Sequence, residues 1–470
     1  MSQTLRLYQS GALDACRASI AAGRRKILLV APTGAGKTTI AAAMIHGAVA
    51  RGGSVVFLAH RSELISQCSE RLDGVGVDHG VIQGGHPRDL PGLPVQVASV
   101  QTLVRREELP RATVLVVDEA HRARAATYGK ILDRYPEAVV IGLTATPWRN
   151  DGRGLGELFE DLVLAARPRE LVDQGFLVPY TGFAYDHPDT AVVERRGADF
   201  DGHGLEMVMG SRKLVGNIVQ QYLEHAPGQL AVVFAVSVAH SIALRDRFLE
   251  AGVAAAHLDG DTPAGERTET LRRMARGEIR VLCNVNLVTE GWDLPALRLC
   301  ILARPTLSTT LYLQMVGRVL RPADGKTVAR IHDHAGCFLE HGAPDLDRDY
   351  SLTADLRTKA GKKEKLPPIR TCEECLRIYD PTLSDSCPSC GHQNLAASRA
   401  PKELDDEKVR RIPLSELPQF AGATESQKRG AYEKWLADAL AAGKKPGMAA
   451  HKYKAVYGHW PPRSWSQGAA

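Results

Sequence analysis

Short apolar runs alternate with stretches of helical composition over most of this chain. Residues 27–31 and 114–117 are β-type runs of Ile, Leu and Val, and the first leads through a glycine-containing turn into an Ala-rich stretch that ends near residue 50. This strand–turn–helix order predicts an α/β domain built on a parallel sheet.

A second series of the same kind begins after residue 228. Residues 230–235 and 281–284 are predicted to be buried strands, and residues 240–251 a helix. The pattern loosens between residues 167 and 228, where residues 205–224 are expected to be helical, and this segment is interpreted as a connector. Residues 425–462 are expected to form a small helical unit.

Composition places the chain among globular proteins. It has 470 residues, of which 44% are apolar and 24% charged, and this excludes a mostly disordered or collagen-like chain. The longest apolar run, residues 231–239, is too short to cross a bilayer. Arg6, Asp14 and Arg17 argue against a signal peptide, so we expect a cytoplasmic, nucleoid-associated protein.

The distribution of charge along the chain is more informative than the net charge of +5. From residue 357 onward there are 20 Lys and Arg against 13 Asp and Glu, whereas the preceding residues are close to neutral. A basic C-terminal section favours a polyanionic partner, although a solvated Lys-rich surface explains the charge equally well.

The turn after the first strand has the composition of a phosphate-binding loop. It reads Pro-Thr-Gly-Ala-Gly-Lys-Thr over residues 32–38, with Ala31 where the motif usually begins with Gly. Glycines let backbone N–H groups face a phosphate, and the helix N-terminus adds partial positive charge. Lys37 is expected to reach the β and γ phosphates of ATP, and the Thr38 hydroxyl to ligate Mg²⁺. The predicted ATP-binding residues here are Thr33, Gly34, Ala35, Gly36, Lys37, Thr38 and Thr39.

Two carboxylates follow the strand at residues 114–117. In a parallel sheet, Asp118 and Glu119 would end beside the phosphate-binding loop. Asp118 is expected to hold Mg²⁺, and Glu119 to polarise the water that attacks the γ-phosphate.

The sequence Asp118-Glu119-Ala-His121 resembles the DEAH box of superfamily 2 helicases. Other segments resemble family motifs in the same order: residues 7–9, which imply that Gln9 contacts adenine; residues 57–65 and 97–103, which imply contacts with the nucleic-acid backbone; and residues 142–147, which imply coupling of ATP hydrolysis to domain movement.

The same resemblance continues through the second series. Residues 286–295 resemble the motif that links nucleic acid to nucleotide, which implies that Asp293 lies near the ribose of ATP. Gln314, Arg318 and Arg321 follow at spacings of four and three, which places them on one face of a predicted helix. They are implied to face ATP across a cleft and to neutralise charge on the γ-phosphate.

Four cysteines form a cluster of their own. Cys372 and Cys375 are separated by eleven residues from Cys387 and Cys390, and this spacing predicts a closed Zn²⁺ site with four thiolate ligands. Iron is an alternative metal, and His392 an alternative ligand. The other five cysteines, Cys16, Cys68, Cys283, Cys300 and Cys337, are expected to be buried small hydrophobes.

Taken together, the resemblance implies two tandem RecA-like parallel-sheet domains, a small Cys₄ zinc module and a helical tail. The expected boundaries are 1–166 and 229–345 for the two domains, 167–228 for the connector, 346–370 for a basic linker, 371–395 for the zinc module and 396–470 for the basic helical region. Residues 329–336 and the zinc cluster resemble the RadD family of bacterial DNA-repair helicases and its phage relatives. His334 is interpreted as a loop-packing residue rather than a metal ligand.

The last stretch mixes lysines with aromatic residues. This pattern favours nucleic-acid binding through phosphate contacts and stacking, although a helical hairpin that buries its own rings would explain it too. The residues are Lys434, Trp435, Lys444, Lys445, Lys452, Tyr453, Lys454, Tyr457 and Trp460.

The sequence therefore predicts a nucleic-acid-stimulated ATPase that uses ATP, Mg²⁺ and Zn²⁺ and acts as a DNA helicase or translocase, in repair or recombination. Its expected partner is single-stranded or forked DNA, with a repair protein as a further partner through the zinc module or tail. Three alternatives remain: the motor of a restriction-type duplex-DNA translocase, for which the sequence offers no convincing nuclease constellation; an annealing factor with a regulatory ATPase; and an RNA helicase.

Overall fold

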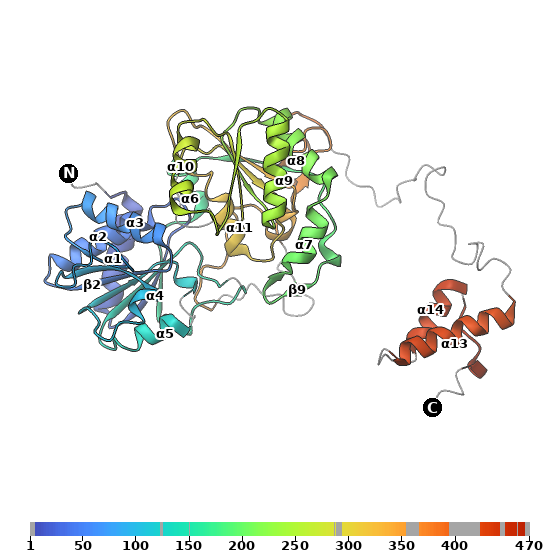
Figure 1. Cartoon of the computed structure of the whole chain (residues 1–470), viewed down its shortest axis with the longest axis horizontal. Helices are drawn as coiled ribbons and strands as arrows, with labels where there is room; N and C mark the ends of the chain where they lie inside the picture. Colours follow the sequence, from blue (N-terminus) through green and yellow to red (C-terminus); the bar gives the residue numbers. More distant parts are fainter. Residues whose placement is uncertain are drawn as a thin grey trace. The chain divides into compact units, whose positions relative to one another are not determined.

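Two parallel sheets with helices packed on their faces make up most of the structure (Figure 1). The structure is a computed structural model and describes residues 5–122, 126–149, 151–285, 287, 294–353, 366–393, 424–441, 447–457 and 459–465. The chain divides into two units, residues 1–394 and 395–470. None of the described helices is both long enough and apolar enough to cross a membrane.

The first sheet has seven strands in the order β3-β4-β2-β5-β6-β1-β7, and every neighbouring pair is parallel. Because β6 lies between β1 and β5, the residues that follow these three strands meet at one edge of the sheet. The strands are β1 (Lys26–Val30), β2 (Val55–Ala59), β3 (Gly80–Ile82), β4 (Val95–Ser99), β5 (Val114–Val117), β6 (Val139–Thr144) and β7 (Asp161–Leu164).

Helices cover both faces of this sheet. The long helices α1, α2 and α3 contribute Leu13, Ile45 and Leu72 to one apolar cluster, and α4 and α5 contribute Leu103 and Ile131 to the other. Apolar strands of this kind are buried on both faces, which explains their continuous Val, Ile and Leu content. The helices are α1 (Leu7–Ala21), α2 (Lys37–Val49), α3 (Ser62–Gly74), α4 (Val100–Leu103) and α5 (Ala126–Leu132), with a 3₁₀ turn η1 (Ala120–Arg122).

The second sheet has six parallel strands in the order β12-β13-β11-β14-β15-β8. Helices α8 and α9 pack on one face through Tyr222 and Phe248, whereas α10, α11 and α12 pack on the other. The strands are β8 (Tyr180–Ala184), β11 (Ala231–Phe234), β12 (Ala255–Leu258), β13 (Val281–Asn284), β14 (Leu299–Leu302) and β15 (Ala329–Asp333). The helices are α6 (Pro168–Asp173), α7 (Gly202–Met209), α8 (Arg212–His225), α9 (Val238–Glu250), α10 (Ala264–Ala275), α11 (Thr309–Val316) and α12 (Cys337–His341).

The segment expected to be a connector is more than that. It supplies the edge strand β8, and the single helix expected at residues 205–224 is two helices that meet at Gly210. Ser211 starts the second of them, because its hydroxyl accepts a hydrogen bond from the Leu214 amide. The segment also holds η2 (Thr190–Val192) and the short antiparallel pair β9 (Arg195–Arg196) and β10 (Asp199–Phe200).

After α12 the chain returns to the first domain. Tyr350 and Leu352 pack against the first domain's second apolar cluster, and the Gly156 amide donates to the Leu352 carbonyl at 3.0 Å. Arg169 pairs with Asp345 at 2.8 Å. The chain after α12 therefore contacts both the first domain and the segment at residues 165–179 that links the two domains.

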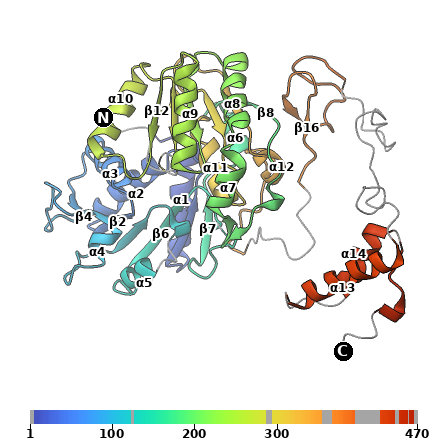
Figure 2. The same ribbon diagram turned by 45° about the vertical axis from the view of Figure 1, so that its right-hand side comes forward.

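Smaller elements complete the structure (Figure 2). The hairpin β16 (Arg370–Thr371) and β17 (Ile378–Tyr379) carries Cys372 and Cys375, and the loop that follows it carries Cys387 and Cys390; residues 370–393 are called the cysteine hairpin below. The second unit contains α13 (Glu425–Ala441), α14 (Gly447–Tyr457) and η4 (Arg463–Trp465). The α/β architecture, the cysteine cluster and the helical tail are all as predicted.

Candidate active site and metal centre

The loop after β1 has the conformation that a phosphate-binding loop requires. Gly34 and Gly36 have φ angles of +91° and +79°, a region that side chains disfavour, and α2 begins directly afterwards at Lys37. The N-terminal amides of α2 therefore face the turn, where they can meet an anion. Thr38 and Thr39 lie in the first turn of this helix.

Gln9 lies against this loop and is almost completely buried. Its side-chain amide donates to the Ala35 carbonyl at 3.0 Å, and its side-chain carbonyl accepts from the Arg6 amide. A methyl group on Gly36 would lie 2.7 Å from the Gln9 side-chain nitrogen. Gln9 thus fixes the loop as well as lining the cleft beside it.

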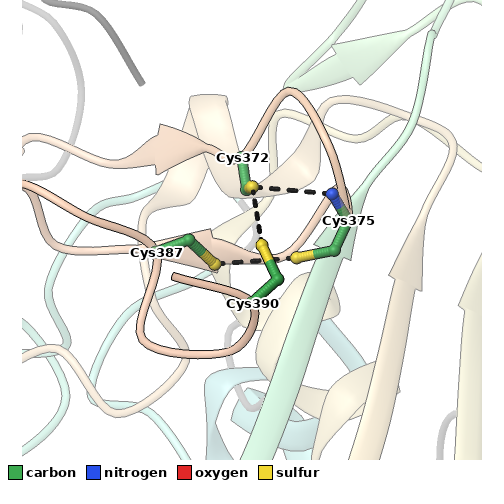
Figure 3. Close-up of side chains that lie close together, drawn as sticks. All are labelled: Cys372, Cys375, Cys387 and Cys390. Atoms are coloured by element: carbon green, nitrogen blue, oxygen red, sulfur yellow. Dashed lines mark hydrogen bonds between the residues drawn. The ribbon is translucent and has the colours of Figure 1, made fainter. Parts of the chain in front are cut away.

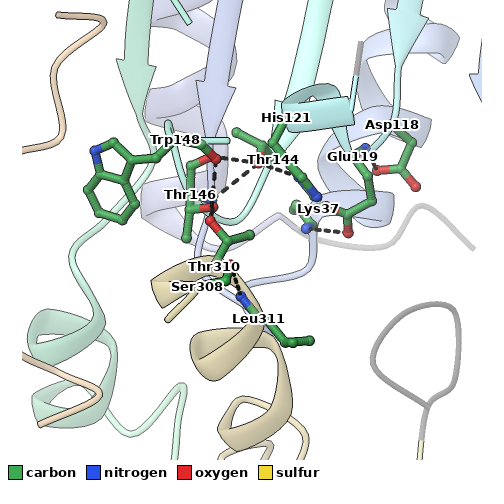
Figure 4. Close-up of polar contacts among 10 residues, drawn as sticks. All are labelled: Lys37, Asp118, Glu119, His121, Thr144, Thr146, Trp148, Ser308, Thr310 and Leu311. Carbon is green, nitrogen blue, oxygen red and sulfur yellow. Dashed lines mark hydrogen bonds and ion pairs between the residues drawn. The ribbon is translucent and has the colours of Figure 1, made fainter. Parts of the chain in front are cut away.

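Asp118 and Glu119 follow β5, and both are buried. The Lys37 ammonium donates to Glu119 Oε1 at 3.0 Å, and the Glu119 amide donates to Asp118 Oδ1 at 3.0 Å. His121 Nδ1 lies 3.4 Å from the other Glu119 oxygen. The structure thus brings together the lysine and the two carboxylates that the sequence singled out (Figure 4).

The surroundings of Glu119 keep it ionised. Burial alone would raise the pKa of this carboxyl, but Lys37 and His121 outweigh burial and hold the pKa well below its ordinary value. Glu119 also has a φ of +49°, a left-handed conformation that costs a non-glycine residue about 1–2 kcal/mol. Strain of this kind is concentrated at functional sites.

A chain of hydroxyl contacts runs from this carboxylate pair to the second domain (Figure 4). His121 Nδ1 lies 3.3 Å from the Thr144 hydroxyl, which donates to the Thr146 carbonyl at 2.7 Å. The Thr146 hydroxyl lies 3.0 Å from that of Thr310 in α11, whose first turn is capped by Ser308. Thr310 was not identified from the sequence, because nothing local distinguishes it from other threonines in the first turn of a helix.

The second domain meets the phosphate-binding loop just after α11. A methyl group on Gly317 would lie 2.5 Å from Thr33 Cβ, so only glycine permits this approach. On the same side, a methyl group on Gly34 would lie 3.3 Å from Arg321 Cγ. This contact was also missed in the sequence, where Gly317 is one glycine among many.

Gln314, Arg318 and Arg321 all line the cleft, but they do not share one helix. The helix ends at Val316, and Arg318 and Arg321 lie in the turn that follows. Tight bonds from the amides of Arg318 and Val319 to the carbonyls three residues earlier replace the helical pattern. The expectation of a continuous helix was therefore wrong, although the three side chains line the same cleft.

These groups converge on one cleft of ≈1230 Å³ between the two domains. The first domain contributes the phosphate-binding loop and both carboxylates, and the second contributes the glutamine and two arginines. The cleft continues between α3 and α10, where Arg267 and Glu63 form an ion pair of 2.6 Å across the domains. The set of donors fits a nucleoside triphosphate with Mg²⁺: amides and cations for phosphate, and a hydroxyl and a carboxylate for the metal.

Lys326 is a further residue that the sequence did not indicate. Its ammonium donates to the carbonyls of Pro295 and Arg321, at 3.0 and 2.8 Å, and both of these residues line the cleft. Burial, followed by the charges of Arg298 and Arg321, lowers the pKa of Lys326 to about 7. The lysine thus joins the two backbone segments on the second-domain side of the cleft.

Two segments expected to contact a nucleic-acid backbone, residues 57–65 and 97–103, lie next to each other. The Gln101 side chain donates to the His60 carbonyl at 3.2 Å. Arg61 reaches across the domains to the Leu287 carbonyl at 3.1 Å. Asp293 lies outside the described residues.

The four clustered cysteines converge as predicted (Figure 3). Their sulfur atoms all lie within 4.8 Å of one another, with 3.5 Å between Cys372 and Cys390 and 3.6 Å between Cys375 and Cys387. Ligands of a tetrahedral zinc with Zn–S bonds of about 2.3 Å are separated by about 3.8 Å. The spacing therefore suits Zn²⁺, and His392 is not among the clustered ligands.

The two halves of this cluster have the same local geometry. The Leu376 amide donates to the Cys372 carbonyl and the Gly391 amide to the Cys387 carbonyl, at 3.0 and 2.9 Å. Both residues have a positive φ, +59° for Leu376 and +74° for Gly391. The first half adopts this turn without a glycine, which the sequence did not suggest.

The cysteine hairpin is attached to the second sheet. The Ala184 amide of β8 donates to the Leu376 carbonyl at 3.0 Å, and Phe183 and Arg377 form an antiparallel bridge. Gly182 is needed here, because a methyl group would lie 2.6 Å from Ile378. The hairpin therefore covers the edge of the sheet.

Comparison with known proteins supports one family. Residues 2–149 match the family model described as the type III restriction enzyme res subunit, and residues 214–323 match the helicase conserved C-terminal domain. A 51.5 kDa protein of a Lactococcus phage is 31% identical over 398 residues, which cover 83% of this chain and 84% of that protein. The chain belongs to the superfamily 2 helicases. Membership in this family implies ATP and Mg²⁺.

Two further matches show how the relatives differ in extent. A Saccharomyces cerevisiae protein described as the ATP-dependent helicase IRC3 is 31% identical over 391 residues, 76% of this chain and 57% of the yeast protein. A structure described as an HsdR subunit of a type I restriction enzyme, from Vibrio vulnificus, superposes with a TM-score of 0.59 at 22% identity, over 73% of this chain and 66% of that one. The second match shows that the fold is shared.

We expect Lys37→Ala and Glu119→Gln to stop ATP turnover for different reasons. Loss of the ammonium should weaken nucleotide binding at least tenfold, whereas loss of the carboxylate should leave binding intact and reduce turnover by about 10²–10⁴. Nucleotide titration and steady-state ATPase assays separate the two effects. Turnover at the wild-type rate in Glu119→Gln would refute the assignment of that residue.

Gly317→Ala should act through geometry alone. The added methyl group would overlap Thr33 and push the second domain away from the phosphate-binding loop. A displacement of about 1 Å can reduce a rate about 10²-fold, so we expect a loss of that order in kcat. Gly216→Ala in α8 is the matched control, since no atom lies within 4 Å of its added methyl group. Equal rates for both variants would contradict the contact.

Metal analysis of the purified protein should find one Zn²⁺ per chain. Structural sites of this kind bind with about 10–16 kcal/mol at neutral pH, so the metal should survive gel filtration. Cys387→Ser should lose the metal and uncover β8, while basal ATP hydrolysis persists because no cleft residue lies in the hairpin. A variant with a folded motor but no ATPase would show that this hairpin takes part in the ATPase cycle.

Proposed function

We propose that the protein is an ATP-driven translocase or helicase that acts on DNA. The observation that carries the proposal is the cleft in which both domains supply groups for phosphate chemistry. When the two domains move apart, the groups that each supplies to the cleft are separated. Opening and closing of the cleft is how such a motor would convert hydrolysis into movement along a strand.

The residues of the cleft divide the chemistry of hydrolysis among them. ATP bound with Mg²⁺ supplies the phosphoryl group that water attacks. Lys37 would leave Glu119 to neutralise the β and γ phosphates, and Thr38 and Asp118 would hold the metal. Glu119, then free of the lysine, would orient the attacking water, while Arg318 and Arg321 neutralise the charge that develops on the γ-phosphate.

A restriction-type translocase is the second candidate. It is favoured by the match of residues 2–149 to the res-subunit family model and by the shared fold with the HsdR subunit. The two candidates use the same motor and differ in what they do to the strands. A helicase separates the strands of a fork, whereas a translocase moves along an intact duplex.

A more specific role in DNA repair or recombination, like that of the RadD family, remains part of the proposal. It rests on the resemblance of residues 329–336 and of the cysteine spacing. The zinc hairpin itself is unsuited to phosphate, because residues 371–393 carry four carboxylates and one guanidinium. Four thiolates around a divalent ion would add further negative charge. A protein partner suits this hairpin better than a nucleic acid does.

ATPase assays with single strands, duplexes, forks and RNA test the proposal. We expect DNA to stimulate hydrolysis, with an affinity that falls as salt rises by a slope of about −0.7 per phosphate contacted in a single strand and about −0.9 in a duplex. Strand-displacement and triplex-displacement assays then distinguish a helicase from a duplex translocase. Hydrolysis that no nucleic acid alters, or that only RNA stimulates, would contradict the proposal.

A further inference from the structure

The C-terminal unit carries aromatic rings that its core buries only in part. Tyr432 of α13 and Tyr453 of α14 are buried in that core, and their rings meet edge to face at 5.8 Å. Trp435 and Tyr457 pack against the edge of the core and are partly buried, and Trp460 is 49% exposed. These three rings therefore keep part of their surface accessible.

Each of these three surface rings lies beneath a lysine. Lys428 of α13 is 5.5 Å from the Tyr457 ring of α14, and Lys452 of α14 is 5.1 Å from the Trp435 ring of α13. The Trp435 and Tyr457 rings are neighbours, with their centroids 6.4 Å apart. These four residues form a strip across both helices, which we call the Lys–aromatic strip. Lys454 and Trp460 repeat the arrangement at 4.5 Å.

The strip lies in a basic part of the chain. Residues 424–465 contain eight Lys and Arg and three Asp and Glu, an excess that equals the +5 of the whole protein. The rest of the chain sums to zero, although residues 357–370 are also basic, with six Lys and Arg and one Glu. Such a surface is complementary to a polyanion.

The rings determine which polyanion fits. Phosphates of duplex DNA would satisfy the lysines but offer no base to the rings, because the bases are already stacked inside the helix. A single strand offers both phosphates and unstacked bases. Stacking of a base on an aromatic side chain generally stabilises more than an exposed ammonium over the same ring does. A base can thus take the place of the lysine on the ring, and the flexible lysine can turn to a phosphate.

We propose that the Lys–aromatic strip binds single-stranded DNA, with bases on Trp435 and Tyr457 and phosphates on Lys428 and Lys452. The inference rests on the proposed function and adds to it a second contact with the DNA, outside the motor. It assigns Tyr453 to the core instead of the binding surface. Lys444 and Lys445, which the sequence also suggested, lie outside the described residues.

Binding of the full chain to a labelled oligothymidylate and to a duplex of equal length tests the strip. Trp435→Ala should weaken single-strand binding about tenfold and leave duplex binding within about twofold, with an unchanged salt slope. Lys428→Ala and Lys452→Ala should each reduce the salt slope by about 0.7. Trp435→Phe should restore much of the affinity, because a phenyl ring still stacks.

Two controls keep the test interpretable. Lys130→Ala removes an exposed charge from α5, outside the C-terminal unit, and should leave the single-strand affinity within about twofold. ATP hydrolysis without DNA should be unchanged in every variant, since none of these residues lies in the cleft. If Trp435→Ala binds the oligothymidylate with wild-type affinity, or loses as much affinity for the duplex as for the single strand, the strip is not a binding site for single-stranded DNA. Failure of all nucleic acids to stimulate the wild-type ATPase would instead overturn the proposed function.

Discussion

The distance between the end of α11 and the phosphate-binding loop sets the geometry of the whole cleft. Gly317 touches Thr33 so closely that a single added methyl group would separate them. This contact places Gln314, Arg318 and Arg321 beside the loop, although α11 ends before the two arginines. The catalytic set is therefore complete only while the domains are closed. A site divided in this way makes hydrolysis depend on domain position, which is the property that a motor needs.

Several buried polar contacts hold the closed arrangement and differ in how easily they can change. The Thr146 and Thr310 hydroxyls join the domains with neutral groups at 3.0 Å, so breaking this contact leaves no charge unpaired. Lys37 and Glu119 are instead a charged pair that a triphosphate would separate. The left-handed φ of Glu119 shows that the backbone there is held against its own preference. The nucleotide-sensitive contact is thus ionic, whereas the domains meet through a neutral contact at Thr310 and an ion pair at Arg267.

Much of this site could be predicted from the sequence because its signals are local. A glycine loop between a strand and a helix, two carboxylates after a strand, and paired cysteines each fix their own chemistry, and a parallel sheet brings the first two together. The features that were missed depend on tertiary contacts: Gly317 is distinguished only by Thr33, and Lys326 only by the carbonyls of Pro295 and Arg321. Similarly, alternating lysines and aromatics could not show that Tyr453 is buried in the core while Trp435 and Tyr457 lie partly exposed at its edge. Burial separates these roles, and the sequence pattern does not.

The central claim is that the second domain supplies arginine to a reaction assembled on the first. Single-turnover hydrolysis of prebound ATP by Arg318→Ala tests it most directly, because this measurement separates binding from chemistry. The account predicts a nucleotide affinity close to that of the wild type and a hydrolysis rate lower by about 10³–10⁵. Hydrolysis at the wild-type rate would contradict it and would mean that the reaction is completed within the first domain.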